Sequence, residues 1–244
     1  MDNYIYLAHE PESLKTAVID PAISEPVLEA LKKRGWQLTH ILNTHHHMDH
    51  VGGNLQLKAE TGCIIVGPAA DEARIPGIDI SLSEGESYDL GNARATIFDI
   101  PGHTRGHMAY WFEESDALFC GDTLFSMGCG RLFEGTPEQM WNSLKKLRAL
   151  PDQTRIYCAH EYTEANGRFA KTIEPLNDAL ATRMAEVLAL RQLGKSTVPS
   201  VMGVEKETNP FLRADQPELK AAVGNPDGDA VEIFAKIRQQ KDAF

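Results

Sequence analysis

Residues 44–50 constrain this chain more than any other part of its sequence, because they read Thr-His-His-His-Met-Asp-His. The stretch follows a short apolar run and precedes two glycines, which is the layout of a strand that ends in a loop opening onto a helix. Alternate side chains of an extended segment point the same way, so His45 and His47 are predicted to aim at one point. Asp49 and His50 follow and are predicted to aim at a neighbouring point. Two adjacent points favour two metal ions over one.

The side chains in this stretch suit a hydrolytic metal site. Imidazole and carboxylate groups bind zinc, and also iron or manganese. The stretch contains no cysteine, which argues against a closed thiolate site. A bound metal ion lowers the pKa of a water molecule to about 7, so that hydroxide is available at neutral pH. The alternatives are a solvated histidine-rich loop and an adventitious metal site. His46 should point away from its neighbours and is not expected to bind metal.

Three more candidate ligands each follow a short apolar strand. They are His103 after Arg94–Ile100, Asp122 after Ala117–Cys120, and His160 after Thr154–Cys158. Functional groups in α/β folds gather where strands end and loops begin. A lone histidine after a strand is more often a hydrogen-bonded structural residue, and a lone aspartate can cap a helix or form a turn. Together with the first cluster, however, these residues supply seven ligands, enough for two ions that share one carboxylate.

The complete set of motifs resembles the metallo-β-lactamase superfamily, and within it the glyoxalase II (hydroxyacylglutathione hydrolase) family. The resemblance spans almost the whole chain, through the ligand motifs, the segments Pro101–Thr104, Gly121–Phe125, Gly128–Gly135 and Cys158–Thr163, and the C-terminal Arg238-x-x-Lys241. It implies that His45, His47 and His103 hold one metal ion, that Asp49, His50 and His160 hold the other, and that Asp122 bridges them. Zinc is the expected metal, with iron or manganese as alternatives. Met48 stands where the family often carries histidine or tryptophan, at a position that should not bind metal.

The same resemblance implies an α/β fold, a four-layer αββα sandwich with a small helical C-terminal domain. Strand-like and helix-like segments alternate up to about residue 165. Among them, Glu25–Arg34 is predicted to be an amphipathic helix that ends at Gly35, and Thr136, Pro137 and Gln139 form a capped helix start. Helical patterns then dominate, whereas residues 194–210 show little periodicity and are predicted to be a linking loop. We therefore expect a dinuclear metal hydrolase domain at 1–165 and a mainly helical substrate-binding domain at 166–244.

Composition limits the partners of the chain. A formal charge of −11 over 244 residues argues against a nucleic-acid backbone as substrate. No apolar run approaches the roughly 18 residues of a membrane span, and no signal-peptide pattern is visible, so we expect a cytoplasmic protein. We expect it to act as a monomer on a small molecule, with no nucleic-acid or membrane partner. The four cysteines are predicted to be buried reduced thiols.

Arg238 and Lys241 are three residues apart on the last predicted helix and therefore share a face. From the residues alone, the simpler interpretation is a pair of cations that favour the helix dipole near a C-terminus. The family resemblance instead implies that the pair binds glutathione, a tripeptide with carboxylates. It implies the same substrate-binding role for Arg131 and Phe133, in the glycine-rich loop, and for Tyr162, just after His160.

The activity implied by the resemblance is hydrolysis of a glutathione thioester of the S-lactoylglutathione type, giving a 2-hydroxy acid and glutathione in methylglyoxal detoxification. A metal-bridged hydroxide would attack the thioester carbonyl, with Asp49 and Asp122 as catalytic carboxylates and Asp49 as acceptor of the proton from water. A thiol has a pKa of about 8.5, so the thiolate leaves without prior protonation, which favours thioesters over β-lactams. The alternatives are a lactonase, β-lactamase or nuclease of the superfamily, a di-iron oxygen-handling protein, which would carry Glu where His47 stands, and a non-catalytic module that captures glutathione conjugates.

Overall fold

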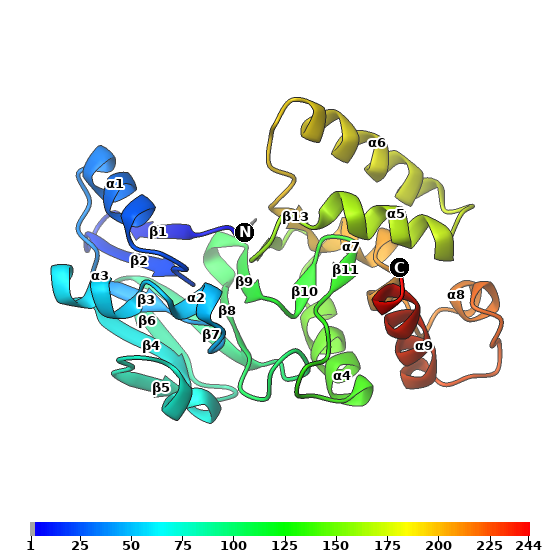
Figure 1. The fold of residues 1–244 in the computed structure, drawn as a ribbon, viewed down its shortest axis with the longest axis horizontal. Helices are drawn as coiled ribbons and strands as arrows, with labels where there is room; N and C mark the ends of the chain where they lie inside the picture. Colours follow the sequence, from blue (N-terminus) through cyan, green and yellow to red (C-terminus); the bar gives the residue numbers. More distant parts are fainter. Residues whose placement is uncertain (1–2) are drawn as a thin grey trace. The chain divides into compact units, whose positions relative to one another are not determined.

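The computed structural model describes residues 3–244, which form two compact units. Unit 1 comprises residues 3–99 and 105–121, and unit 2 comprises residues 100–104 and 122–244. Figure 1 shows the chain coloured from its N-terminus to its C-terminus, with its helices and strands labelled.

A five-stranded sheet in the order β1-β2-β3-β4-β5 forms one layer of unit 1. β1 and β2 form an antiparallel hairpin, whereas β2 to β5 pair in parallel. Parallel neighbours need long crossover connections, and the helices α1 and α3 provide two of them. The bounds are β1 Tyr6–Glu10, β2 Lys15–Ile19, α1 Glu25–Arg34, β3 His40–Leu42, α3 Asn54–Thr61, β4 Ile64–Pro68 and β5 Ile80–Leu82.

Helices α1 and α3 cover one face of this sheet (Figure 1). Val27 of α1 and Leu57 of α3 pack in one buried cluster with Val18, Ile41 and Ile65 of the three central strands. The helix over Glu25–Arg34 was predicted with these bounds, and Gly35 ends it in a left-handed conformation with φ 68°. The helix therefore presents its apolar stripe to the sheet and its charged residues to solvent.

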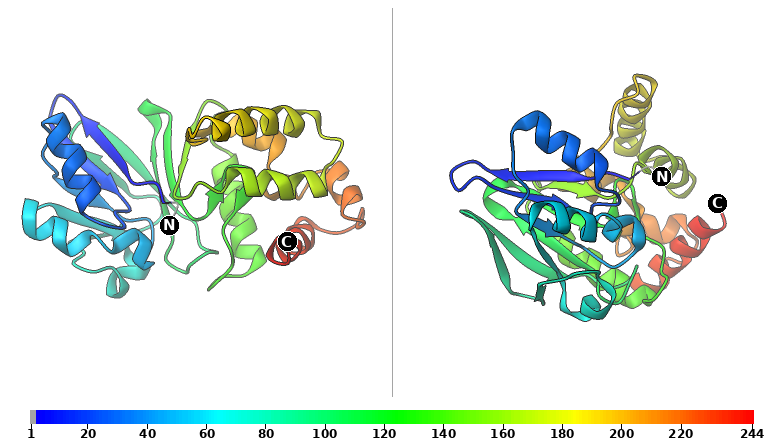
Figure 2. Two further views of the ribbon diagram at one scale, coloured as in Figure 1. Left: turned by 45° about the horizontal axis from the view of Figure 1, so that its top comes forward. Right: turned by 60° about the vertical axis from the view of Figure 1, so that its left-hand side comes forward.

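Four antiparallel strands form a second layer in unit 1, and Figure 2 shows the strand layers from two further sides. Tyr110 of β8 joins this layer to the first sheet, because its hydroxyl donates to the carbonyls of Asn43 and Val66 at 2.9 and 3.3 Å. Burial holds the pKa of Tyr110 well above its ordinary value, so the hydroxyl remains a donor. The strands are β6 Ser87–Leu90, β7 Ala93–Asp99, β8 Met108–Phe112 and β9 Ala117–Gly121.

Unit 2 is mainly helical, as predicted for the C-terminal part of the chain. Phe169, Phe211 and Phe234 are fully buried at its centre, with Phe211 in ring contact with both others. Helix α4 begins at the predicted capping box, in which Thr136 and Gln139 exchange side-chain to backbone hydrogen bonds of 3.2 and 2.9 Å. The elements are β10 Leu124–Phe125, β11 Gly128–Cys129, α4 Pro137–Arg148, β12 Arg155–Cys158, α5 Thr163–Ile173, α6 Asp178–Gln192, β13 Ser200–Val201, α7 Met202–Thr208, α8 Pro217–Ala222 and α9 Ala230–Asp242.

The predicted linking loop at residues 194–210 is wrong in its second half, which contains β13 and helix α7. The buried side of α7 includes Glu205 and Thr208 as well as Met202, so the helix has no apolar stripe that periodicity would reveal. Donors from Ser126 and Met127, far away in the sequence, satisfy Glu205, whereas the hydroxyl of Thr208 donates to the carbonyl of Val204 within the helix. The domain boundary near residue 165 stays a prediction.

The cysteines and the lengths of the helices bear on two further expectations from the sequence. All four cysteines, Cys63, Cys120, Cys129 and Cys158, are buried and free of disulfides, as predicted. Among residues 3–244, no helix combines the length and the apolar character needed to cross a bilayer.

Candidate metal centre

The histidine-rich stretch leaves the carboxyl end of β3 and enters the short helix α2, Met48–Val51. His47 has the extended conformation of a residue that precedes a helix, with φ −60° and ψ 144°. The Nε2 atom of His45 and the Nδ1 atom of His47 lie 3.1 Å apart. These alternate histidines therefore aim at one point, where their ring nitrogens can share one metal ion.

His50 is fully buried and lies beside His45, with ring centroids 4.0 Å apart. Its Nδ1 atom lies 3.1 Å from Oδ2 of Asp20, and its Nε2 atom lies 3.7 Å from the carboxylate of Asp49. Asp20 also accepts hydrogen bonds from the backbone N–H and the hydroxyl of Thr44, both at 2.7 Å. Both oxygens of Asp20 are thus engaged, so Asp20 is placed to orient His50 and the loop.

Asp20 is not among the residues that the sequence motifs indicate. The available signal was its position at the carboxyl end of β2, because β2 pairs in parallel with β3 and brings Asp20 beside Thr44. Parallel strands that end at the same edge of a sheet place their following residues together.

His46 points into a different set of contacts, as predicted. Its Nδ1 atom lies 2.8 Å from the buried carboxylate of Asp71, and its Nε2 atom lies 3.2 Å from a guanidinium nitrogen of Arg74. Asp71 and Arg74 also form an ion pair. Met48 is 72% exposed, and the expectation that this position does not bind metal stays a prediction.

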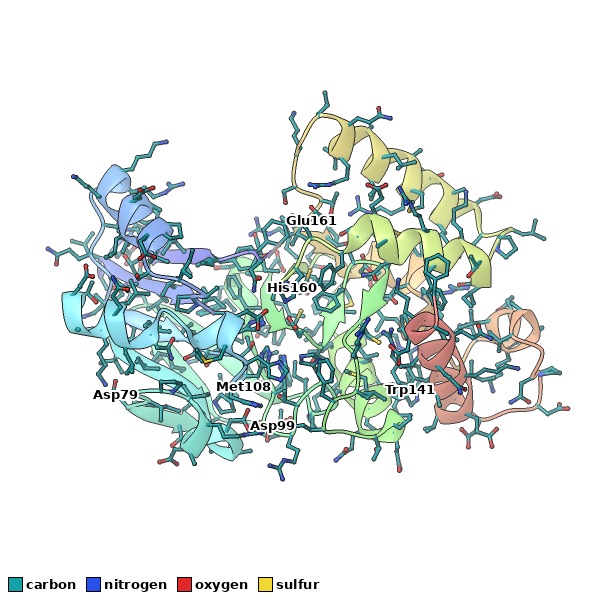
Figure 3. The ribbon with its side chains drawn as sticks, in the orientation of Figure 1. Asp79, Asp99, Met108, Trp141, His160 and Glu161 are labelled. Carbon is teal, nitrogen blue, oxygen red and sulfur yellow. The ribbon has the colours of Figure 1, made fainter. Side chains whose placement is uncertain are left out.

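Unit 2 brings His103, Asp122 and His160 together. Asp122 follows β9, His103 lies in the segment 100–104, and His160, labelled in Figure 3, lies between β12 and α5. The two oxygens of the Asp122 carboxylate face different imidazoles: Oδ2 lies 3.4 Å from Nε2 of His103, and Oδ1 lies 3.3 Å from Nε2 of His160. A carboxylate that bridges two metal ions needs this division of its oxygens.

Residues of the glycine-rich loop support His103. The Nδ1–H group of His103 donates to the carbonyl of Arg131 at 2.9 Å, which leaves Nε2 to face Asp122. The backbone N–H of Gly130 donates to the carbonyl of Thr123 at 3.2 Å. A Cβ atom at Gly130 would lie 2.0 Å from the carbonyl oxygen of Asp122 and 3.1 Å from Nδ1 of His103. Only glycine allows the loop to approach the ligands this closely.

Aromatic rings flank the ligands of unit 2. Tyr162 stacks on His160, with centroids 4.8 Å apart and an interplanar angle of 12°. Phe133 is 62% exposed and meets the ring of His103 edge-on, with centroids 5.1 Å apart. Both residues were predicted to bind substrate, and both offer apolar surface next to a candidate ligand.

The three predicted substrate-binding cations gather near Asp242. Arg238 is only 5% exposed and donates to the carbonyl of Cys129 at 2.9 Å and to Asp242 at 2.8 Å. The guanidinium of Arg131 lies 4.0 Å from Asp242. Lys241 lies 5.2 and 5.1 Å from the rings of Phe169 and Phe244, and burial, followed by the nearby Arg238 and Arg131, lowers its pKa. Asp242 thus pairs with Arg238 and Arg131, and Lys241 lies near these two cations, so positive charge is in excess here and favours an added anion.

Comparisons with known proteins agree with these motifs. Residues 4–160 match the family model described as the metallo-beta-lactamase superfamily, and residues 161–244 match the one described as hydroxyacylglutathione hydrolase C-terminus. A curated protein of Methylococcus capsulatus named hydroxyacylglutathione hydrolase is 62% identical over 243 residues, covering 100% of this chain and 95% of its own length. This chain belongs to the hydroxyacylglutathione hydrolase family. The resemblance found in the sequence is therefore confirmed.

Solved structures share the fold of this chain. ETHE1 from Myxococcus xanthus superposes with a TM-score of 0.68 at 22% identity, covering 99% of this chain and 94% of its own. TTHA1623 in a di-iron-bound form superposes with a TM-score of 0.61 at 26% identity, covering 86% of this chain and 94% of its own. The metallo-β-lactamase fold predicted from the motifs is confirmed, and the chain carries His/Asp clusters suited to a dinuclear metal centre.

Proposed function

We propose that this chain hydrolyses glutathione thioesters of the S-lactoylglutathione type to glutathione and a 2-hydroxy acid. The observation that carries the proposal is the convergence of His103 and His160 on separate oxygens of Asp122. This arrangement occurs in a chain that is 62% identical, over its whole length, to a protein named hydroxyacylglutathione hydrolase.

The metal ions are assigned to seven residues. His45, His47 and His103 hold one ion, Asp49, His50 and His160 hold the other, and Asp122 bridges them. Within each unit the donor atoms suit metal binding. In unit 1 the ring nitrogens of His45 and His47 converge, and in unit 2 Asp122 divides its oxygens between two imidazoles. Zinc is the proposed metal. Iron and manganese also accept imidazole and carboxylate ligands, and the related TTHA1623 has a di-iron-bound form.

When bound, the two ions would lower the pKa of a water molecule and stabilise negative charge on the thioester oxygen. The protein prepares their ligands. Asp20 and the carbonyl of Arg131 accept the Nδ1–H groups of His50 and His103, which keeps each imidazole in the tautomer whose Nε2 can bind metal. Asp49 accepts the proton of the attacking water. The glutathione thiolate leaves without a proton because a thiol has a pKa of about 8.5, so the site needs no general acid.

Substrate recognition is assigned to unit 2. Arg131, Arg238 and Lys241 supply positive charge for the carboxylates of glutathione. Tyr162 and Phe133 supply aromatic surface, and Phe133 contributes packing only, since it has no hydrogen-bond donor. We place the reaction in the cytoplasm, in methylglyoxal detoxification, carried out by a monomer without nucleic-acid or membrane partners.

The test combines metal analysis with hydrolysis of S-lactoylglutathione and a panel of lactones. We expect two metal ions per chain, faster turnover of the thioester than of any lactone, and a loss of about a hundredfold or more in kcat/KM for His50→Ala. His46→Gln is the matched control from the same motif, and it should retain most of the activity because His46 contacts Asp71 and Arg74 instead. Full activity in His50→Ala, or in metal-free protein, would refute the proposal.

A further inference from the structure

Glu205 is a fully buried carboxylate on α7 that the proposed reaction does not use. Four donors approach it. They are the hydroxyl of Ser126 at 2.9 Å, the backbone N–H of Met127 at 2.7 Å, the amide of Asn209 at 3.1 Å and the hydroxyl of Ser200. A buried charge is tolerated only when such donors compensate its lost hydration. Two of these donors belong to the turn of the β10–β11 hairpin, so Glu205 holds that turn.

The turn itself has an unusual conformation. Met127 has φ 54°, in the left-handed region that hairpin turns normally reserve for glycine or asparagine. Its side chain is fully buried in a cluster with Ala170, Leu180, Met184 and Val187 of α5 and α6. The cluster holds Met127 by its side chain, and Glu205 holds it by its backbone N–H. A residue that is disfavoured in this conformation is thus fixed from two sides.

Asn209, one helical turn after Glu205, fixes the two strands of the same hairpin. Its amide nitrogen donates to the carbonyls of Phe125 in β10 and Gly128 in β11, both at 3.0 Å. Asn166 of α5 adds a hydrogen bond of 3.2 Å to the carbonyl of Ser126. The whole hairpin is therefore held by buried side chains of α5, of α7 and of Asn209, which directly follows α7.

The base of this hairpin joins directly onto the candidate ligands. Asp122 lies two residues before β10, and Arg131, whose carbonyl accepts the Nδ1–H of His103, lies two residues after β11. The hydrogen bond from Gly130 to Thr123 closes the base between them. Any shift of the turn is transmitted along two-residue strands to Asp122 and to the residue that orients His103.

We propose that Glu205 is a positioning residue of the metal centre, which acts through the β10–β11 hairpin. With Asn209 it fixes the hairpin in one place, so Asp122 and His103 are arranged for the metal before it binds. The inference rests on the metal site of the proposed function. It predicts that metal affinity, and not stability alone, depends on a carboxylate that never contacts the metal.

The main test compares Glu205→Gln with Glu207→Gln. Both variants remove one carboxylate from α7, but Glu207 is exposed and does not face the hairpin donors. We expect Glu205→Gln to weaken zinc affinity by about tenfold or more, measured by competition with a chromophoric chelator, as changes to groups that orient metal ligands commonly do. The absorption spectrum of the Co²⁺-loaded protein should change as well. Glu207→Gln should match the unaltered protein in both measurements.

A pair of serines separates positioning from stability. Ser126 and Ser200 donate to the same oxygen of Glu205, but only Ser126 belongs to the hairpin, since Ser200 lies in β13. Ser126→Ala should weaken zinc affinity severalfold and Ser200→Ala should not, although both should lower the unfolding temperature of the metal-free protein. Unchanged affinity in Glu205→Gln, or equal losses in the two serine variants, would overturn the inference. If Glu205→Gln does not fold, the comparison of Ser126→Ala with Ser200→Ala tests the inference by itself. Absence of metal from the unaltered protein would reject the proposed function as well.

Discussion

Asp122 divides its carboxylate between two imidazoles, with one oxygen 3.4 Å from His103 and the other 3.3 Å from His160. An ionised carboxylate has two equivalent acceptor oxygens, so a single side chain can serve two neighbouring ions. An amide of the same shape has one oxygen, and its nitrogen is a donor that repels a cation. The difference between aspartate and asparagine therefore tests the bridging role without a change in volume.

Asp122→Asn is expected to lose at least one of the two metal ions and to reduce kcat/KM for S-lactoylglutathione by about a hundredfold or more. Its fold should survive, because the substitution is isosteric. Metal content by elemental analysis, steady-state kinetics and far-ultraviolet circular dichroism check these outcomes. Two tightly bound ions in the variant would contradict the bridging role.

Two buried thiols, those of Cys129 and Cys158, are expected to be unreactive in the native protein. Burial raises the pKa of Cys129 to about 11 and that of Cys158 to about 12. The thiolate is the reactive form, so at pH 8 both side chains are protonated as well as inaccessible. We expect an aromatic disulfide reagent to modify them slowly in the native protein and rapidly in denaturant. Rapid reaction of either thiol under native conditions would show that these thiols are accessible.

Helix α4 shows how an element is fixed differently at its two ends. Its start is fixed by neighbouring residues, through the capping box between Thr136 and Gln139. Its end is fixed by distant residues: Arg148 donates to both oxygens of Asp215, at 2.8 and 2.6 Å, and to the carbonyl of Leu212 at 2.7 Å. The hydrogen-bonded guanidinium of Arg148 holds the pKa of Asp215 below its ordinary value.

Arg148→Met is expected to lower the free energy of unfolding by about 1 kcal/mol at neutral pH, a figure that allows for screening because Asp215 is one-third exposed. Asp215 has a depressed pKa in the folded state. The ion pair therefore stabilises the folded state fully at pH values above the ordinary pKa of an aspartate, and this stabilisation is lost as the pH falls through the depressed pKa. The difference in the free energy of unfolding between the variant and the unaltered protein should therefore disappear at acid pH. Urea denaturation at a series of pH values measures it, with Lys145→Met as the control. A difference that is independent of pH would contradict this role of Asp215.

Over the whole molecule, the proposed ligands are spread along the sequence from His45 to His160. Metal ions bound by these ligands would stabilise the folded chain by mass action, because the unfolded chain does not arrange the ligands.

Removal of the metal is expected to lower the unfolding temperature by about 5–10 °C. A free metal concentration of about a hundred times the Kd stabilises by about 2.7 kcal/mol, and each kcal/mol shifts the unfolding temperature of a chain this long by about 2–4 °C. Thermal unfolding with and without a chelator measures the shift, and Asp122→Asn should show a smaller one. Equal unfolding temperatures with and without metal would exclude a stabilising metal centre.

Features whose cause lies within a few neighbouring residues could be predicted from the sequence alone. The alternation of His45 and His47, the left-handed Gly35 that ends α1, and the capping box of α4 all depend on local backbone geometry. The motifs spread along the chain also predicted the fold, through their resemblance to the metallo-β-lactamase superfamily.

The polar side chains that support the candidate ligands, in contrast, could be identified only from the folded chain. Asp20 reaches His50 across 30 positions of sequence, and Ser126 reaches Glu205 across 79. A buried carboxylate has no apolar periodicity, so α7 was predicted to be a loop, and Asp20 was not identified. Burial of a charge depends on donors that other elements bring to it, and those elements are neighbours only after the chain has folded.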